Sequence, residues 1–146
     1  MLYKSEVAIG TNAFGYSYLG YEYLFKGKEQ WSVFGELGLA VPLSKYTSGT
    51  FYSIGSRWFT KRKGKGLTLA GNISFHKGSV YREYQGGEET YLEYLGFGIT
   101  IGYTLLFDEV FSIYPYLGSG LYNYSNINGA YLDKMILGGL QIGFRL

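Results

Sequence analysis

The chain has 146 residues, of which 20% are aromatic, 23 are glycine and only 16% are charged. This composition excludes a disordered chain, and its glycine and aromatic content disfavours long helices. The net charge of +2 is too small to indicate binding to nucleic acid, and the absence of cysteine excludes disulfides, thiolate catalysis and cysteine-based zinc sites. A single all-β domain over residues 1–146 is therefore expected.

Apolar and polar residues alternate with a period of two along the whole chain, which predicts β-strands throughout. Turn-forming residues interrupt the alternation seven times, so eight strands are predicted. The connections are short, which favours antiparallel strands in up-and-down order. The predicted strands span residues 2–11, 15–26, 31–41, 50–60, 67–82, 88–107, 110–124 and 131–146.

The two faces of these strands differ in composition. In the sixth strand, Leu95, Phe97 and Ile99 alternate with Gly96 and Gly98. The interior of an eight-stranded barrel is only just wide enough for side chains, so the bulky apolar face would overfill it. The face of glycine, tyrosine and polar residues would also make a poor water-soluble exterior. The pattern therefore predicts a transmembrane β-barrel with the apolar face toward lipid, and a soluble barrel with a ligand cavity is the alternative.

Aromatic residues mark one rim of the predicted barrel. They are the outward residues at the strand ends beside the second, fourth and sixth turns, and they include both tryptophans of the chain. Aromatic side chains collect at membrane interfaces. Both chain ends share this rim, so we expect it to face the periplasm. The predicted membrane-interface aromatics are Phe25, Trp31, Trp58, Phe107, Phe111 and Phe144.

Six charged residues, three of each sign, face the predicted interior. Buried charges must pair, so we expect a structural ion-pair network across the lower lumen. An acid–base pair of Glu22 and Glu36 is the alternative, but three nearby cations would keep both carboxylates ionised, so no catalytic residue is predicted. The predicted lumen network comprises Lys4, Glu6, Glu22, Glu36, Arg57 and Arg145.

The single histidine, His76, is predicted to face inward with Ser74 and Asn72 of the same strand. A lone histidine with no carboxylate in its row cannot hold a metal ion. We therefore expect neither a metal site nor a cofactor, and a histidine bonded to neighbouring polar groups.

The fifth and sixth predicted strands exceed the roughly 9–11 residues that a strand needs to cross a membrane. A hairpin over about 77–93 is therefore expected to project from the outer surface, where its open strand edges could pair with a protein partner. An inert hairpin in contact with lipopolysaccharide is the alternative. The hairpin residues singled out are Tyr81, Arg82, Glu83, Glu88, Glu89 and Tyr91.

As a whole, the pattern resembles the small eight-stranded outer-membrane barrels of Gram-negative bacteria, which include the OmpA membrane domain and OmpX. The segment Leu140–Leu146 is similar to the C-terminal signal read by the barrel-assembly machinery, with its aromatic residue, Phe144, two positions early. The resemblance implies a non-enzymatic protein of the cell outer membrane with a structural, adhesive or accessory role. Its expected partners are outer-membrane lipid, lipopolysaccharide, the assembly machinery during insertion and a surface or complex protein. No signal peptide is visible, which leaves two alternatives, a cytosolic protein or a mature chain that has lost its signal peptide and been given a start Met. The resemblance implies the second.

Two other functions remain open from the sequence. Lipid A deacylases are also eight-stranded barrels, with a serine, a histidine and an acid, but their His-x-Ser-Asn signature faces lipid. Here Ser74-Phe75-His76 has the reverse order and is predicted to face inward. A narrow pore is less favoured, because inward residues such as Tyr18, Phe34 and Tyr114 should block the lumen.

Overall fold

The computed structural model describes residues 5–12, 16–25, 27, 30–40, 47–82, 88–126 and 129–146. For residues 40, 47–48, 79–82, 88–92, 124–126, 129–131 and 133 it describes the backbone only. The described residues include no helix that is long and apolar enough to cross a membrane.

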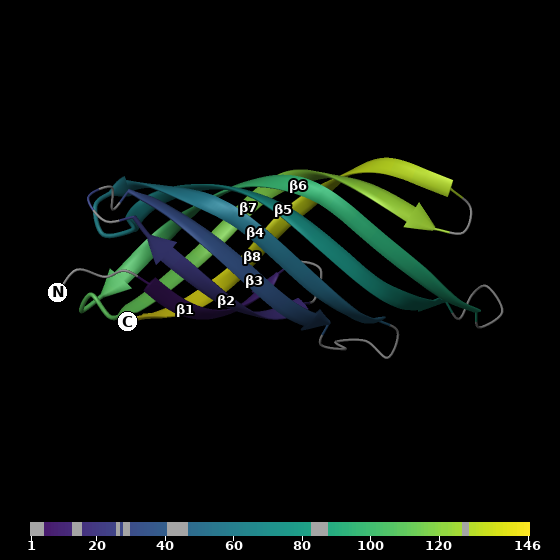
Figure 1. Cartoon of the computed structure of the whole chain (residues 1–146), viewed down its shortest axis with the longest axis horizontal. Coiled ribbons are helices and arrows are strands. Elements are labelled where there is room, and N and C mark those ends of the chain that lie inside the picture. The colour runs from purple at the N-terminus through teal and green to yellow at the C-terminus, as the bar shows by residue number, and fades with distance from the viewer. Residues whose placement is uncertain are drawn as a thin grey trace.

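Eight strands form one closed barrel in the order β1 to β8, and each strand pairs antiparallel with its neighbours in sequence. Pairing of β1 with β8 closes the barrel. The predicted eight-stranded antiparallel up-and-down barrel is therefore confirmed (Figure 1). The strands are β1 (Ser5–Asn12), β2 (Tyr16–Leu24), β3 (Trp31–Ala40), β4 (Thr47–Lys61), β5 (Lys65–Arg82), β6 (Glu88–Phe107), β7 (Phe111–Asn126) and β8 (Gly129–Arg145).

Several strand boundaries differ from the sequence prediction by one to three residues, among them those of β4 and of the β7–β8 hairpin. β4 begins at Thr47 rather than at residue 50, because Thr47 pairs with Val80 of the long β5. The pair Asn126 and Gly129 extends β7 and β8 into what was predicted as a turn. In both places polar residues suggested a loop, but the neighbouring strand supplies partners for their backbone groups.

Side chains alternate between interior and exterior as the sequence pattern predicts. On β6, Ile99 is 57% exposed and the adjacent Thr100 is 8% exposed. The interior holds aromatic, hydroxyl and charged side chains, whereas the large aliphatic residues mostly lie outside. This distribution is the reverse of that in a water-soluble barrel.

The strands differ greatly in length. β1, β2 and β3 have 8, 9 and 10 residues, whereas β5 and β6 have 18 and 20. Figure 1 shows the start of β1 and the end of β8, the two described termini, at one end of the barrel, and the β5–β6 and β7–β8 hairpins reaching beyond the shorter strands at the other. The barrel therefore has a nearly level end with the termini and a slanted end with two long hairpins.

Candidate functional site

Arg57 of β4 joins two carboxylates inside the barrel. Its Nη1 lies 2.5 Å from Glu22 Oε2 of β2, and its Nη2 lies 3.3 Å from Glu36 Oε1 of β3. Nη2 also donates a hydrogen bond of 2.8 Å to Gln141 Oε1 of β8. The side chains of Arg57, Glu22 and Glu36 are each at most 10% exposed. Four strands are thus tied together by one guanidinium.

Aromatic rings complete the surroundings of Arg57. The guanidinium carbon lies 4.2 Å from the ring centre of Phe34 and 4.7 Å from that of Tyr114. The hydroxyl of Ser32 donates a hydrogen bond to Glu22. The cation is thus held by rings as well as by carboxylates, an arrangement suited to fixing the strands rather than to moving protons.

A second ion pair lies nearer the chain termini. Arg145 Nε of β8 lies 2.9 Å from Glu6 Oε2 of β1, and the Ser112 hydroxyl donates a hydrogen bond of 2.8 Å to Glu6 Oε1. Arg145 also donates hydrogen bonds to the backbone oxygens of Lys63 and Gly64 in the β4–β5 turn, the latter at 2.7 Å. This pair therefore anchors a turn across the end of the barrel.

The structure brings five of the six predicted lumen charges into these two groups, and the sixth, Lys4, lies outside the described residues. Glu6 and Glu22 face each other in the β1–β2 pairing. Sequence reasoning missed Gln141, Ser32 and the turn carbonyls as partners. Alternation gives the face of a residue, but only the register between strands decides which inward groups meet.

An aromatic layer surrounds His76 toward the slanted end. Its ring centre lies 4.7 Å from that of Phe51, 5.3 Å from Tyr16 and 5.7 Å from Tyr122. Its Nε2 lies 3.3 Å from Ser74 Oγ, which lies 3.0 Å from the Tyr122 hydroxyl. His76 and Ser74 are thus buried in the interior, away from the face that a lipid substrate would approach.

The described residues form two hollows, one inside the barrel and one on its exterior. An interior cavity of about 50 Å³ lies among Arg57, His76 and Tyr114, with room for a few water molecules. A larger hollow of about 660 Å³ lies on the exterior and is lined by apolar residues that include Leu37 and Ile54. The interior cavity is lined by polar side chains but is far smaller than the roughly 300–1,000 Å³ of an ordinary ligand pocket, and the exterior hollow is mainly apolar.

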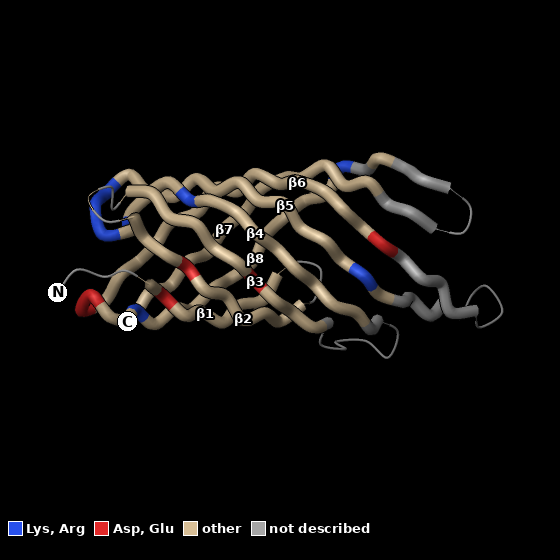
Figure 2. The backbone as a smooth tube through the Cα atoms, viewed as in Figure 1, with Lys and Arg blue, Asp and Glu red and all other residues tan. Residues whose placement is uncertain are grey.

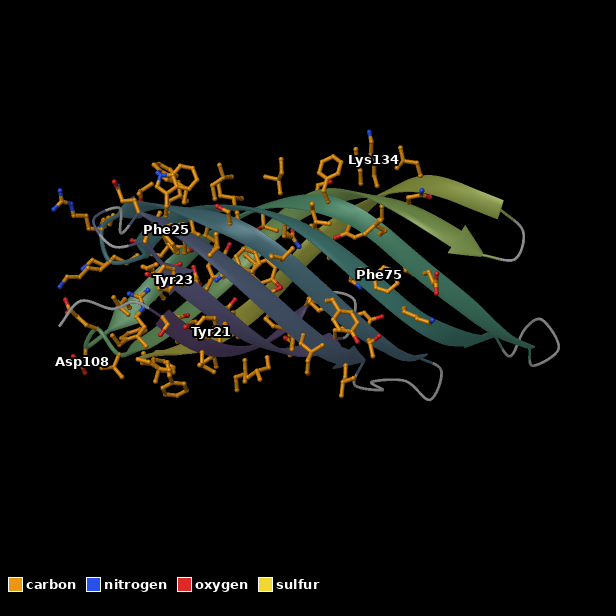
Figure 3. The ribbon with its side chains drawn as sticks, viewed as in Figure 1. Tyr21, Tyr23, Phe25, Phe75, Asp108 and Lys134 are labelled. Atoms are coloured by element: carbon orange, nitrogen blue, oxygen red, sulfur yellow. The ribbon has the colours of Figure 1, made fainter. Side chains whose placement is uncertain are left out.

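Three of the predicted rim aromatics lie together on β2 to β4. Trp31 and Trp58 face each other in the β3–β4 pairing, and the backbone N–H of Phe25 donates to the carbonyl of Trp31 at 3.1 Å. Figure 3 shows Tyr21, Tyr23 and Phe25 following one another toward the end with the termini. Trp31 is 48% exposed, so its ring faces the surroundings of the barrel.

The other three rim aromatics lie on β6 to β8. Phe111 pairs with both Phe107 and Phe144, and its ring centre lies 5.9 Å and 5.4 Å from theirs. The six predicted residues therefore gather at one end of the barrel in two groups of three, on the exterior.

Charged side chains on the exterior occupy the two ends of the barrel. Among the described side chains, those at the end with the termini lie in the turns over 61–65 and 108–109, as the coloured tube shows (Figure 2). Lys63 donates a hydrogen bond to the Glu109 carboxylate, and this contact holds the pKa of Glu109 below its ordinary value. The described exterior charges toward the other end are Lys77, Glu93 and Lys134, the last projecting from β8 in Figure 3.

An uncharged band separates these ends. On β6 this band runs from Leu95 to Phe107. All of its outward residues, which are every second residue of this stretch, are hydrophobic and 43–57% exposed. At about 3.4 Å per residue and a tilt of roughly 40°, this stretch is about 30 Å high. That height matches the hydrocarbon core of a bilayer, about 30 Å.

The predicted hairpin residues lie at the tip of β5 and β6. Tyr81 pairs with Glu89 and Arg82 with Glu88 in the backbone register, and Tyr91 pairs with Ser79. Glu83 and the side chains of the other five lie outside the described part of the chain. At the base of the hairpin, Lys77 Nζ and Glu93 Oε1 form an exposed ion pair at 3.3 Å.

No family model matches the chain, and no curated protein matches it. The crystal structure of the N-terminal β-barrel domain of Pseudomonas aeruginosa OprF is similar, with a TM-score of 0.52 and 16% identity. The match covers 98% of this chain and 97% of that one. The likeness extends over the whole barrel and supports, at the level of fold, the resemblance to OmpA-like barrels.

Proposed function

We propose that the chain is a non-enzymatic integral β-barrel of the bacterial outer membrane with a closed lumen and a role in surface contact. The observation that carries this proposal is the reversed distribution of side chains in a closed barrel. Charged and polar groups are buried, whereas residues such as Ile54 (67% exposed) and Ile73 (59% exposed) cover the exterior. Exposure of this apolar exterior to water would be unfavourable, whereas contact with lipid hydrocarbon would stabilise it.

The lengths of the hairpins give the proposed barrel an orientation, because outer-membrane barrels have short periplasmic turns and longer extracellular loops, and the long β5–β6 and β7–β8 hairpins lie at the slanted end. Aromatic side chains prefer the headgroup level of a membrane, and the rim residues lie beside the end that carries the termini. In this orientation that end faces the periplasm, and the long hairpins extend into the outside medium. Lipopolysaccharide and outer-membrane phospholipid are then the partners of the apolar band.

The interior contents support a closed lumen. Arg57 and its partners cross the barrel between four strands, and a layer of rings that includes His76 and Phe51 fills the space toward the slanted end. We therefore predict no steady ion conductance when the purified protein is inserted in planar bilayers. Channels of stable and reproducible size would contradict the closed lumen.

Open strand edges support a role in surface contact. β8 pairs with β1 only over Gly139–Arg145, because β1 ends at Asn12. Within the described chain, no strand pairs with the β1 side of Gly129–Gly138. Beside this edge, Leu132 is 72% and Ile136 is 76% exposed. An unpaired edge with apolar neighbours accepts an extended segment of another protein by strand addition.

The membrane placement is tested by folding the protein into detergent and comparing heated with unheated samples on a gel. A shift in migration on heating is expected for a membrane barrel. A protein that is soluble and folded without detergent would contradict the proposal.

A contact role is also proposed for the projecting β5–β6 hairpin, because residues 88–92 of β6 have no β7 partner among the described residues, and it is tested by shortening that hairpin. Gly78 and Leu92 face each other, so residues 79–91 can be replaced by an Asn-Gly turn without changing the register below them. The shortened barrel is expected to keep its heat-dependent shift and to lose adhesion of expressing cells to surfaces or host proteins. Unchanged adhesion would contradict a contact role for this hairpin.

A further inference from the structure

We infer that the β4–β5 turn, residues 61–65, binds the phosphate groups of anionic phospholipids in the leaflet at the end with the chain termini. This inference rests on the proposed membrane placement. It gives a function to the basic run Lys61-Arg62-Lys63-Gly64-Lys65.

The turn lies directly beyond the aromatic rim. β4 passes from Trp58 to Lys61 in three residues, and Trp58 faces Trp31 on β3. The Gln30 side-chain amide donates a hydrogen bond of 3.2 Å to the backbone oxygen of Thr60, which ties the turn to the neighbouring connection. With the tryptophans at the membrane interface, the basic side chains lie at the depth of lipid phosphates.

The backbone of the turn is fixed. Lys63, Gly64 and Gly66 have positive φ angles of 63°, 59° and 91°. Arg145 donates hydrogen bonds to the carbonyls of Lys63 and Gly64, and is itself paired with Glu6. The basic side chains therefore extend from a loop whose backbone is already fixed, so less conformational entropy is lost when a headgroup binds.

The charges of the turn favour an anion. Lys61, Arg62 and Lys65 are exposed, and Lys63 is paired with Glu109 of the β6–β7 turn. Asp108 is the other described acidic side chain in the turns at this end. Four cations against two carboxylates leave the described turns of this end positive, which attracts anionic lipid surfaces.

The two tryptophans allow a local test, because they are the only ones in the chain and both lie beside the turn. The folded protein is placed in vesicles of zwitterionic phosphatidylcholine with a fraction of anionic phosphatidylglycerol. Either lipid is brominated on its acyl chains, and quenching of tryptophan fluorescence gives the relative affinity of the two lipids at this rim. We expect a preference for phosphatidylglycerol of at least about fivefold, the factor for one cation near an anionic surface, and its decline with added salt.

The variant K61Q/R62Q/K65Q is expected to lose this preference, while both brominated lipids still quench. The matched control K77Q/K134Q removes two cations toward the opposite end and is expected to keep it. Equal quenching by the two lipids in the unmodified protein, or a preference that survives in the triple variant, would overturn the inference and leave the membrane barrel intact. Quenching by neither lipid would instead overturn the proposed membrane placement, and the inference with it.

Discussion

Replacing a single polar residue inside this barrel affects stability mainly by leaving its buried partners without a hydrogen bond or an opposite charge. Arg57 satisfies Glu22, Glu36 and Gln141 at once, and its own position depends on those groups. In a buried site the loss of one partner leaves an uncompensated charge, which costs more than the pair itself contributes. The same ion pair at the surface is replaced by water at little cost.

Two glutamates test this difference, because each forms an ion pair at 3.3 Å. Glu36 pairs with Arg57 in the interior, whereas Glu93 pairs with Lys77 on the outside. We predict that Glu36→Ala lowers the free energy of unfolding in detergent by about 2 kcal/mol, the usual value of a hydrogen bond to a charged group, because Arg57 loses one acceptor but keeps Glu22 as its partner. Glu93→Ala should change it by less than about 1 kcal/mol. Equal unfolding curves in urea for the two variants would contradict a structural role for the interior charges.

At the scale of whole strands, the sequence predicts the faces of each strand more clearly than the pairing between strands. Alternation predicts the inward and outward faces, because they follow from a backbone period of two, and the turn-forming residues that interrupt it predict the number of strands. The register between strands is set by contacts between distant segments, and alternation cannot reveal it. For this reason the sequence predicts Glu36 and Arg57 as inward residues but not their pairing, and it does not indicate the unpaired edge of β8 that begins where β1 ends.

Glycines on β3 give a prediction for one strand. A Cβ added to the inward Gly38 would lie 2.9 Å from the backbone oxygen of Ser17 and 3.1 Å from the Phe51 ring. A Cβ on the outward Gly35 would meet only the Ser53 oxygen, at 3.9 Å. Gly38→Ala should therefore destabilise the barrel by about 1–3 kcal/mol through overpacking. Gly35→Ala should leave stability unchanged or raise it by up to about 1 kcal/mol, because glycine weakens strands. Thermal unfolding in detergent that ranks the two variants in the opposite order would contradict the assigned faces.

The whole molecule combines a polar interior with an apolar exterior whose height is similar to that of a bilayer core. Closure pairs every strand with two neighbours, and the long hairpins extend beyond the shorter strands (Figure 1). The rim aromatics and the basic turn then lie at one interface. The central claim is that the apolar face of the barrel contacts lipid.

Ile99, in the middle of the apolar stretch of β6, tests this claim most directly. The chain has no cysteine, so Ile99→Cys and, as a control, Lys77→Cys can each carry a single spin label. In vesicles, the label at position 99 should be relaxed strongly by oxygen, which concentrates in hydrocarbon, and weakly by a water-soluble nickel chelate. The label at position 77 should respond more strongly to nickel. A label at position 99 that responds more to nickel than to oxygen, or to neither, would contradict the account.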